Sequence, residues 1–230
     1  MTGGTVTLAG TSDGAPIGAL MLSAMGTRRG AIILLQEIFG IDANMAADAG
    51  RWAEAGFDVI APSLFDRVEP NFTAHHSPEG IAKGFAAMQS TPDQQAIGDI
   101  AACVLWAEER GVGPIFIVGY CLGGRLAWRA AAALKGIAGA AVYYGDVLRH
   151  IDETPACPVI CHFGGRDMHL PVAEIAAAMP VRHPAIPVHV YTGSGHGFNN
   201  AGAPDADPRD AEAARTLTRA FFETSCTRLP

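Results

Sequence analysis

Long hydrophobic runs are missing from this sequence. No stretch reaches 18 consecutive apolar residues, the length that a membrane-spanning helix needs, because the most apolar segment, residues 130–144, is interrupted by Lys135, Gly136 and Gly139. The first four residues also lack the charged and then apolar pattern of a signal peptide. We therefore expect a cytoplasmic protein with no membrane partner.

Basic clusters and nucleotide-binding motifs are also missing. Lysine and arginine together number 16 against 23 aspartates and glutamates, which gives a net charge of −7, and no basic run exceeds two residues. This balance argues against a nucleic-acid partner. The 27 glycines form many loops, but none has the G-x-G-x-x-G or G-x-x-x-x-G-K-[ST] spacing that predicts a nucleotide cofactor.

Cysteines are few, and their number is odd. The five cysteines lie mostly in apolar surroundings, so they do not indicate a disulfide framework. Cys157, Cys161 and His162 could form a metal site, but their apolar strand-like setting favours core packing. His75 and His76 resemble a loop that leads into a helix, although they could contact a metal or substrate. We predict no metal.

The remaining pattern is an alternation of apolar strand-like segments with helical ones, and 49% of the residues are hydrophobic. The predicted strands are residues 5–8, 17–22, 31–35, 58–61, 115–118, 140–144, 158–163 and 188–191. The predicted helices are residues 44–55, 78–89, 93–110, 124–134, 172–179 and 208–223. Short, almost wholly apolar strands are typical of a parallel sheet covered on both faces. The alternation predicts one α/β domain over residues 1–230, with a mostly parallel sheet of about eight strands and helices on both faces.

The most informative segment is Gly-Tyr-Cys-Leu-Gly-Gly at residues 119–124, which joins a predicted strand to a predicted helix. This context is typical of the strand–turn–helix elbow that presents a nucleophile in α/β-hydrolases, here with Cys121 in the place of serine. Glycines flank the nucleophile because so sharp a turn leaves no room for a neighbouring Cβ. The helix N-terminus also favours a thiolate. The alternative is a core cysteine beside a glycine-rich strand end.

Three further polar residues follow predicted strands. Glu37 comes after an apolar run, where a carboxylate is costly unless it is paired or used. Asp167 lies on a Gly-Gly turn, and His196 lies among three glycines. Each has an ordinary structural alternative: a solvated strand end, a turn aspartate or a structural histidine. The order Cys121, Asp167, His196 nevertheless matches the nucleophile–acid–histidine order of α/β-hydrolases, which favours a catalytic triad.

These motifs together resemble the dienelactone hydrolase (carboxymethylenebutenolidase) family of the α/β-hydrolase fold. The matching segments are Gln-Glu-Ile-Phe-Gly at 36–40, the elbow at 119–124, Tyr-Tyr-Gly at 143–145, Gly-Gly-Arg-Asp at 164–167 and Gly-His-Gly-Phe at 195–198. The resemblance extends from about residue 31 to residue 222. It implies a cofactor-free hydrolase of small lactones or esters, active in the degradation of aromatic compounds as a monomer or small homo-oligomer.

The resemblance also implies a role for each site residue. Cys121 is then the nucleophile, His196 the base and Asp167 the residue that orients the base, while Glu37 contacts the cysteine and controls its ionisation. The backbone N–H groups of Ile38 and Leu122 are implied to form the oxyanion hole, and Phe39 and Tyr144 to line the substrate pocket.

The sequence departs from the family in the residues that bind the substrate carboxylate. Well-known members use two arginines, one shortly after the histidine and one in an earlier helix. Here the first stretch contains Asn199 and Asn200, and the second offers only Lys83. The substrate could therefore be a dienelactone or an uncharged ester or lactone. A third hypothesis is a non-catalytic protein that binds a small ligand.

Overall fold

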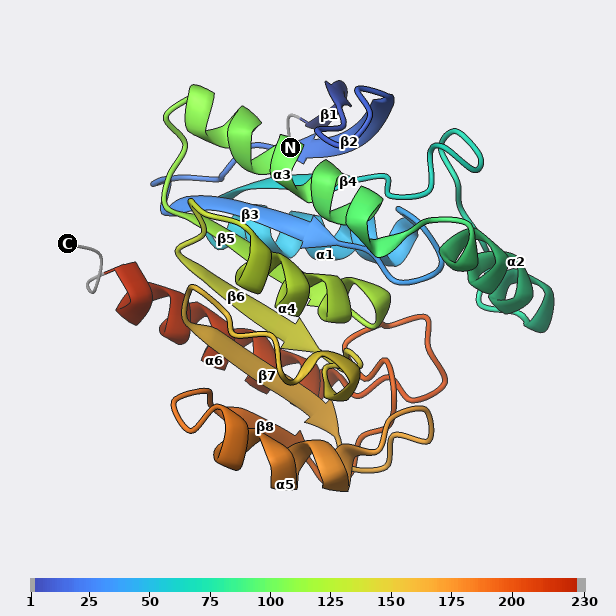
Figure 1. Ribbon diagram of the computed structural model, residues 1–230, viewed down its shortest axis with the longest axis vertical. Coiled ribbons are helices and arrows are strands. Elements are labelled where there is room, and N and C mark those ends of the chain that lie inside the picture. Colours follow the sequence, from blue (N-terminus) through green and yellow to red (C-terminus); the bar gives the residue numbers. More distant parts are fainter. Residues whose placement is uncertain (1–2, 227–230) are drawn as a thin grey trace. The chain divides into compact units, whose positions relative to one another are not determined.

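The computed structural model describes residues 3–226, which contain eight strands and six α-helices (Figure 1). The strands are β1 (Gly3–Ala9), β2 (Pro16–Leu22), β3 (Gly30–Leu35), β4 (Phe57–Pro62), β5 (Ile115–Tyr120), β6 (Gly139–Tyr143), β7 (Val159–Gly164) and β8 (Val188–Tyr191). The α-helices are α1 (Ala43–Glu54), α2 (Pro78–Gln89), α3 (Asp93–Glu109), α4 (Leu122–Ala133), α5 (Val172–Arg182) and α6 (Pro208–Cys226).

The strands follow the order β1-β2-β4-β3-β5-β6-β7-β8, which confirms the predicted α/β class with a mostly parallel sheet. The chain divides into two compact units, residues 1–117 and 118–230, and the boundary lies inside β5. A single domain over the whole chain stays a prediction. Each unit is built as a layer of strands with helices on both faces, α3 and α1 in the first and α4 and α6 in the second (Figure 1).

The first unit combines an antiparallel edge with a parallel pair. β1 pairs with β2 and β2 with β4 in antiparallel register, whereas β3 pairs with β4 in parallel register. Every residue of β3 and β4 is buried, as expected for strands covered on both faces. After β3 the chain passes through the glutamate motif to α1, which begins where the Asp42 carboxylate accepts a hydrogen bond from the Met45 N–H at 2.9 Å.

The second unit contains the parallel strands β6, β7 and β8. Tyr143 at the end of β6 lies opposite His162 in β7. In parallel strands the carboxyl ends meet at one edge, which is where α/β proteins place their chemistry. The turn from β5 into α4, the loop after β7 and the loop after β8 are therefore the segments to search for a site.

Most predicted element ends agree with the structure to within two residues, and the exceptions lie at helix termini. α5 was expected to end at Met179, before Pro180, but it continues to Arg182. Proline removes one donor from the helix without removing later ones, and the His183 N–H still donates to the Met179 carbonyl at 2.7 Å. α6 likewise extends to Cys226 instead of ending at Glu223.

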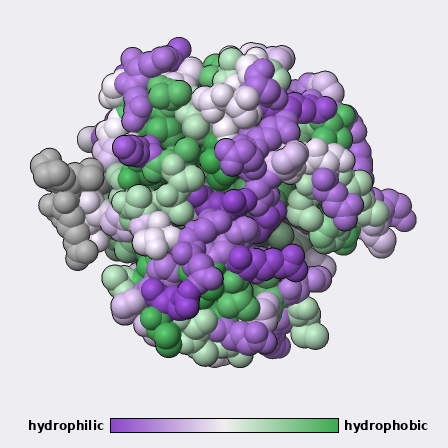
Figure 2. Space-filling model, viewed as in Figure 1, coloured by the Kyte–Doolittle hydropathy of each residue, from purple (hydrophilic) through white to green (hydrophobic). Residues whose placement is uncertain are grey.

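Hydrophilic and hydrophobic residues are intermixed on the face shown in Figure 2. Large apolar side chains are exposed in both units, and Met168, next to one of the predicted triad residues, is 90% exposed. Among residues 3–226, no helix combines the length and apolar character required to cross a membrane.

Candidate active site

Cys121 occupies the sharp turn that the sequence predicts. It lies between the end of β5 and the first residue of α4, with φ at +52°, a left-handed conformation that is strained for any residue with a Cβ. Its N–H donates to the Tyr143 carbonyl at 3.0 Å, which ties the turn to the end of β6. The flanking glycines are required sterically: a Cβ on Gly119 would overlap the Gly123 carbonyl, and one on Gly124 would lie 2.6 Å from the Tyr143 oxygen.

Asp167 and His196 form a direct pair beside this turn. Asp167 follows β7, and its carboxylate is fully buried. One oxygen, Oδ1, accepts hydrogen bonds from the backbone N–H groups of His169 and Leu170 at 2.7 and 3.1 Å. The other, Oδ2, lies 2.7 Å from His196 Nδ1. Because Nδ1 is engaged by Asp167, Nε2 is the ring nitrogen left for the hydrogen bond that His196 makes with Cys121.

Asp167 and His196 each stabilise the charged form of the other, as their pKa values indicate. Burial lowers the pKa of His196, but hydrogen bonds to Asp167 and Cys121 outweigh burial and raise it to about 10. Burial alone would raise the pKa of Asp167, yet the hydrogen bond from His196 and the two backbone N–H groups bring it below its ordinary value. At neutral pH the site therefore holds an imidazolium against a buried carboxylate.

This arrangement predicts how His196 contributes to stability as the pH changes. Its pKa is higher in the folded protein than the ordinary 6.5, so its contribution is complete below about pH 6.5 and is lost as the pH rises towards 10. We expect the free energy of unfolding of the wild type to exceed that of His196→Gln most at pH 6 and least at pH 10. Urea unfolding at pH 6, 8 and 10 measures the difference, and a difference that grows with pH would contradict the assignment.

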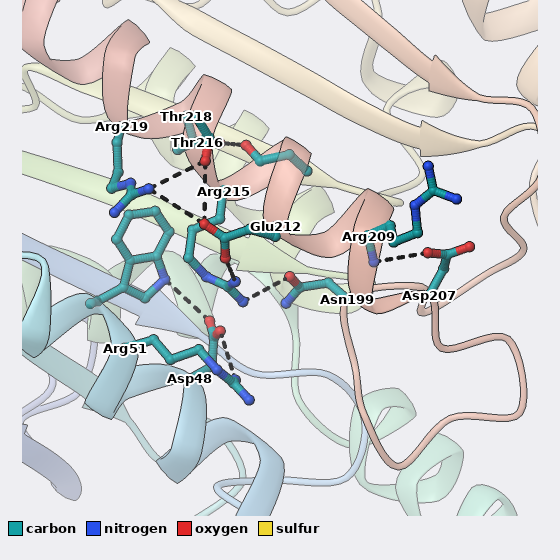
Figure 3. A network of polar contacts seen from close by, with 12 residues as sticks. Asp48, Arg51, Asn199, Asp207, Arg209, Glu212, Arg215, Thr216, Thr218 and Arg219 are labelled. Carbon is teal, nitrogen blue, oxygen red and sulfur yellow. Dashed lines mark hydrogen bonds and ion pairs between the residues drawn. The ribbon is translucent and has the colours of Figure 1, made fainter.

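The loop that carries His196 is held from several sides. The Arg166 N–H donates to the Ser194 carbonyl at 2.9 Å, and the Arg166 side chain donates to the carbonyl of Gly193. The Ser194 hydroxyl donates to Asp210 of α6 at 2.6 Å. Figure 3 shows a further contact, from Arg215 of α6 to the Asn199 oxygen, at 3.2 Å. Hydrogen bonds to the loop after β7 and to α6 thereby hold a loop that is rich in glycine.

Two aromatic rings lie against the His196 imidazole. The Tyr144 ring is 5.1 Å away, and Tyr144 is buried with a positive φ of 39°. The His169 ring is 5.0 Å away in an edge-on arrangement. Tyr144 was among the predicted site residues, whereas sequence reasoning missed His169. The available signal was its place two residues after Asp167, on the turn where its own N–H bonds the carboxylate.

Apart from Leu122, the remaining predicted site residues lie in the first unit. Glu37 and Ile38 are buried directly after β3. Phe39 is half-buried and stacks on His76 at 3.8 Å between ring centroids. Lys83 of α2 is exposed, pairs with Glu69 at 3.0 Å and lies over the Phe72 ring. Leu122, the other predicted oxyanion donor, is the first residue of α4 in the second unit. Their roles stay predictions.

Three of the residues considered for metal binding are buried in a strand or paired with another side chain. Cys161 and His162 are buried within β7, and both ring nitrogens of His162 are hydrogen-bonded, to Tyr191 and Thr218. His76 is paired with Asp42 at 2.9 Å. Across the described part of the chain, no group of three or more His, Cys, Asp and Glu side chains is placed to hold a metal ion.

Comparisons with known proteins agree on one family. Residues 17–226 match the dienelactone hydrolase family. A carboxymethylenebutenolidase of Pseudomonas putida is 31% identical over 195 residues, 81% of this chain and 82% of that protein. A putative carboxymethylenebutenolidase of Synechocystis is 28% identical over 184 residues, 73% of this chain and 74% of that protein.

Solved structures show the same fold. The crystal structure of a putative dienelactone hydrolase from Klebsiella pneumoniae superposes with a TM-score of 0.82 at 22% identity, covering 97% of this chain and 99% of that one. An alpha-beta serine hydrolase homologue from Coxiella burnetii superposes with a TM-score of 0.69 at 15% identity, covering 96% of this chain and 98% of that one. With the family match extending over most of its length, the chain belongs to the dienelactone hydrolase family of α/β-fold hydrolases.

Proposed function

We propose that this protein hydrolyses small lactones or esters through a Cys121–His196–Asp167 triad and a thioester intermediate. The observation that carries the proposal is the chain of contacts in the second unit: Cys121 on a strained elbow, hydrogen-bonded to His196, whose other nitrogen is held by Asp167 at 2.7 Å. This arrangement has the parts that nucleophilic catalysis needs, a nucleophile, a base and a group that orients the base.

The first step is acylation. The proton shared by Cys121 and His196 resides on His196. The sulfur of Cys121 then attacks the carbonyl carbon of the substrate. The negative charge that develops on the carbonyl oxygen is stabilised by the N–H of Leu122, which lies in the first turn of α4, where backbone donors have no partner inside the helix. The family resemblance supplies Ile38 N–H as the second donor.

Ring opening then breaks the bond between the carbonyl carbon and the ring oxygen. In an enol lactone the leaving group is a stabilised enolate, so it departs with little help and suits a thiol nucleophile. The acyl group remains on Cys121 as a thioester. The proton on His196 passes to the departing enolate oxygen, which leaves the imidazole neutral. His196 then takes a proton from water, the hydroxide adds to the thioester carbonyl, and the carbon–sulfur bond breaks, which releases the carboxylic acid and returns Cys121 as a thiolate beside protonated His196.

The residues of the glutamate motif complete the proposal by resemblance to the family. Glu37 is proposed to influence the ionisation of Cys121, and its burial is consistent with a carboxylate that is used and not merely solvated. Phe39 and Tyr144 are proposed to contact the substrate. Lys83 can bind a substrate carboxylate only by sharing or giving up its ion pair with Glu69.

The substrate is proposed to be a lactone of the dienelactone type, 4-carboxymethylenebut-2-en-4-olide, as the name of the Pseudomonas relative suggests. One observation favours an uncharged ester or lactone instead: Asn199 stands in the stretch where the family's arginine is expected, and its oxygen accepts a hydrogen bond from Arg215. A purely ligand-binding role is the third possibility, and the retained triad argues against it.

A panel of substrates tests the function and the substrate class together. Wild-type protein is mixed with a carboxylated dienelactone, the matching lactone without the carboxylate, and an uncharged phenyl ester, and hydrolysis is followed by ultraviolet absorbance. We expect turnover of lactones, and a preference for the carboxylated one identifies the dienelactone as the substrate. A preference for the neutral compounds would move the assignment to uncharged substrates. No turnover, with a Cys121 that reacts with iodoacetamide no faster than a free thiol, would contradict the enzyme assignment.

A further inference from the structure

His162 is a fully buried histidine for which the proposed reaction has no chemical use. We propose that His162, Thr218 and Tyr191 form a positioning network for catalysis: they hold the strained strand end at Tyr143 and Tyr144, against which Cys121 and His196 are placed. The inference rests on the proposed function of the triad and adds residues that neither bind nor transform the substrate themselves.

The hydrogen bonds of this network can be assigned donor by donor. Thr218 Oγ1 lies 3.0 Å from the Ala214 carbonyl, 2.8 Å from the Tyr143 hydroxyl and 3.0 Å from His162 Nε2. A carbonyl only accepts, so the single hydroxyl proton of Thr218 goes to Ala214, and both other groups must donate to Thr218. His162 therefore carries its proton on Nε2, and its Nδ1 accepts from the Tyr191 hydroxyl at 3.0 Å. Every polar atom of the imidazole is then satisfied in the neutral form.

Burying a polar network of this kind in a protein core costs free energy. Burial, together with the neighbouring His189, keeps the pKa of His162 well below its ordinary value, in agreement with a neutral ring. An aliphatic side chain in β7 would need no partners at all, whereas a buried imidazole must be matched at both nitrogens or lose free energy. Such a network gives a unique geometry to the elements it joins, here β6, β7, β8 and α6.

The network holds backbone groups that contact the proposed catalytic residues. Tyr143, which the network holds by its hydroxyl, accepts the Cys121 N–H at its carbonyl at 3.0 Å. The carbonyl of His162 accepts the N–H of Tyr144 at 2.8 Å. Tyr144 has a φ of +39° and touches the His196 ring. A strained backbone persists only where its surroundings hold it in place, and the network supplies part of those surroundings through His162 and Tyr143.

The network also contacts the loop that carries His196, through Tyr191. Tyr191, which donates to His162, packs its ring 4.9 Å from the ring of Phe198, two residues after His196. Phe198 is buried and also lies 5.5 Å from Tyr144. The same network thus contacts Tyr143, which bonds the nucleophile's N–H, and Phe198, in the loop that carries the base.

The substitution Thr218→Val tests the proposal because it keeps the shape of the side chain and removes the shared acceptor. We expect kcat to fall by about ten- to a hundredfold with KM within about twofold, since small displacements of catalytic groups carry costs of this size. The rate at which iodoacetamide alkylates Cys121, located by peptide mass mapping across a pH series, should change as well. Thr218→Ser keeps the hydroxyl and should restore both values. Thr216→Val is the matched control, an exposed threonine on the same helix (Figure 3).

The possible outcomes are distinguishable. A fall in kcat and an altered alkylation profile in Thr218→Val, both restored by Thr218→Ser, support the network. Unchanged kcat and alkylation, with only a lower melting temperature, would overturn it. If Thr218→Val does not fold, Tyr191→Phe removes the bond to His162 Nδ1 alone and must show the same signature. Alkylation requires no substrate, so it also decides the case of a wild type inactive on every lactone, which would contradict the proposed function. There, an alkylation profile altered in Thr218→Val and restored in Thr218→Ser supports the network, and an unchanged profile overturns it.

Discussion

Asp167→Asn is expected to lower kcat by about 10⁴-fold, because it selects the wrong tautomer of His196. The backbone N–H groups of His169 and Leu170 bind one oxygen of Asp167 and will hold the amide oxygen of asparagine in the same place. The NH₂ group then faces His196 Nδ1, where the carboxylate accepted a hydrogen bond. A donor there forces the ring proton onto Nε2, and the histidine can no longer accept the proton of Cys121.

Folding of the variant and a matched control separate this mechanism from a loss of structure. Asp167→Asn should fold, since its backbone contacts survive, but kcat should stay low at neutral pH. Asp146→Asn is the matched control in the same unit, because Asp146 pairs with the exposed Arg149 and lies outside the triad. Single substitutions in a catalytic triad usually lower kcat strongly. A kcat of Asp167→Asn within about tenfold of wild type would therefore contradict the role of the carboxylate.

The parts of the site that the sequence could predict are those that depend on local pattern. The β5–α4 elbow is visible as an apolar run, two glycines around Cys121 and a helical segment, because the turn imposes its residue types within a few positions. Asp167 and His196 follow recognisable strands, and parallel strands bring their ends to one edge. Strand ends were predictable for the same reason: β7 and β8 are bounded by residues that leave the apolar pattern.

The contacts that could not be predicted join residues far apart in the chain. Thr218 is 56 residues from His162 and 75 from Tyr143, and no periodicity connects them. The apolar strand around His162 favours core packing, and only its neighbours in space show that the ring belongs to a polar network. The positive φ of Tyr144 was invisible for a similar reason, since tyrosine carries no preference for that conformation.

Replacing Cys121 with alanine has the largest expected effect. The variant lacks the atom that forms the thioester, so turnover should fall at least about 10⁴-fold, leaving only what binding and the oxyanion donors provide. Cys157→Ala is the matched control: Cys157 belongs to the same unit, and burial raises its pKa to about 12, which makes it a poor nucleophile at neutral pH. We expect that control to keep wild-type turnover.

The most direct test of the triad is the ultraviolet absorbance of a dienelactone mixed in parallel with wild-type protein, Cys121→Ala and Cys157→Ala. If Cys121 is the nucleophile, absorbance is lost with the wild type and Cys157→Ala and persists with Cys121→Ala. If the neutral lactone replaces the dienelactone as the better substrate, the same pattern must appear with that compound. Turnover by Cys121→Ala within about tenfold of wild type would contradict the mechanism, because no triad enzyme retains its rate without its nucleophile.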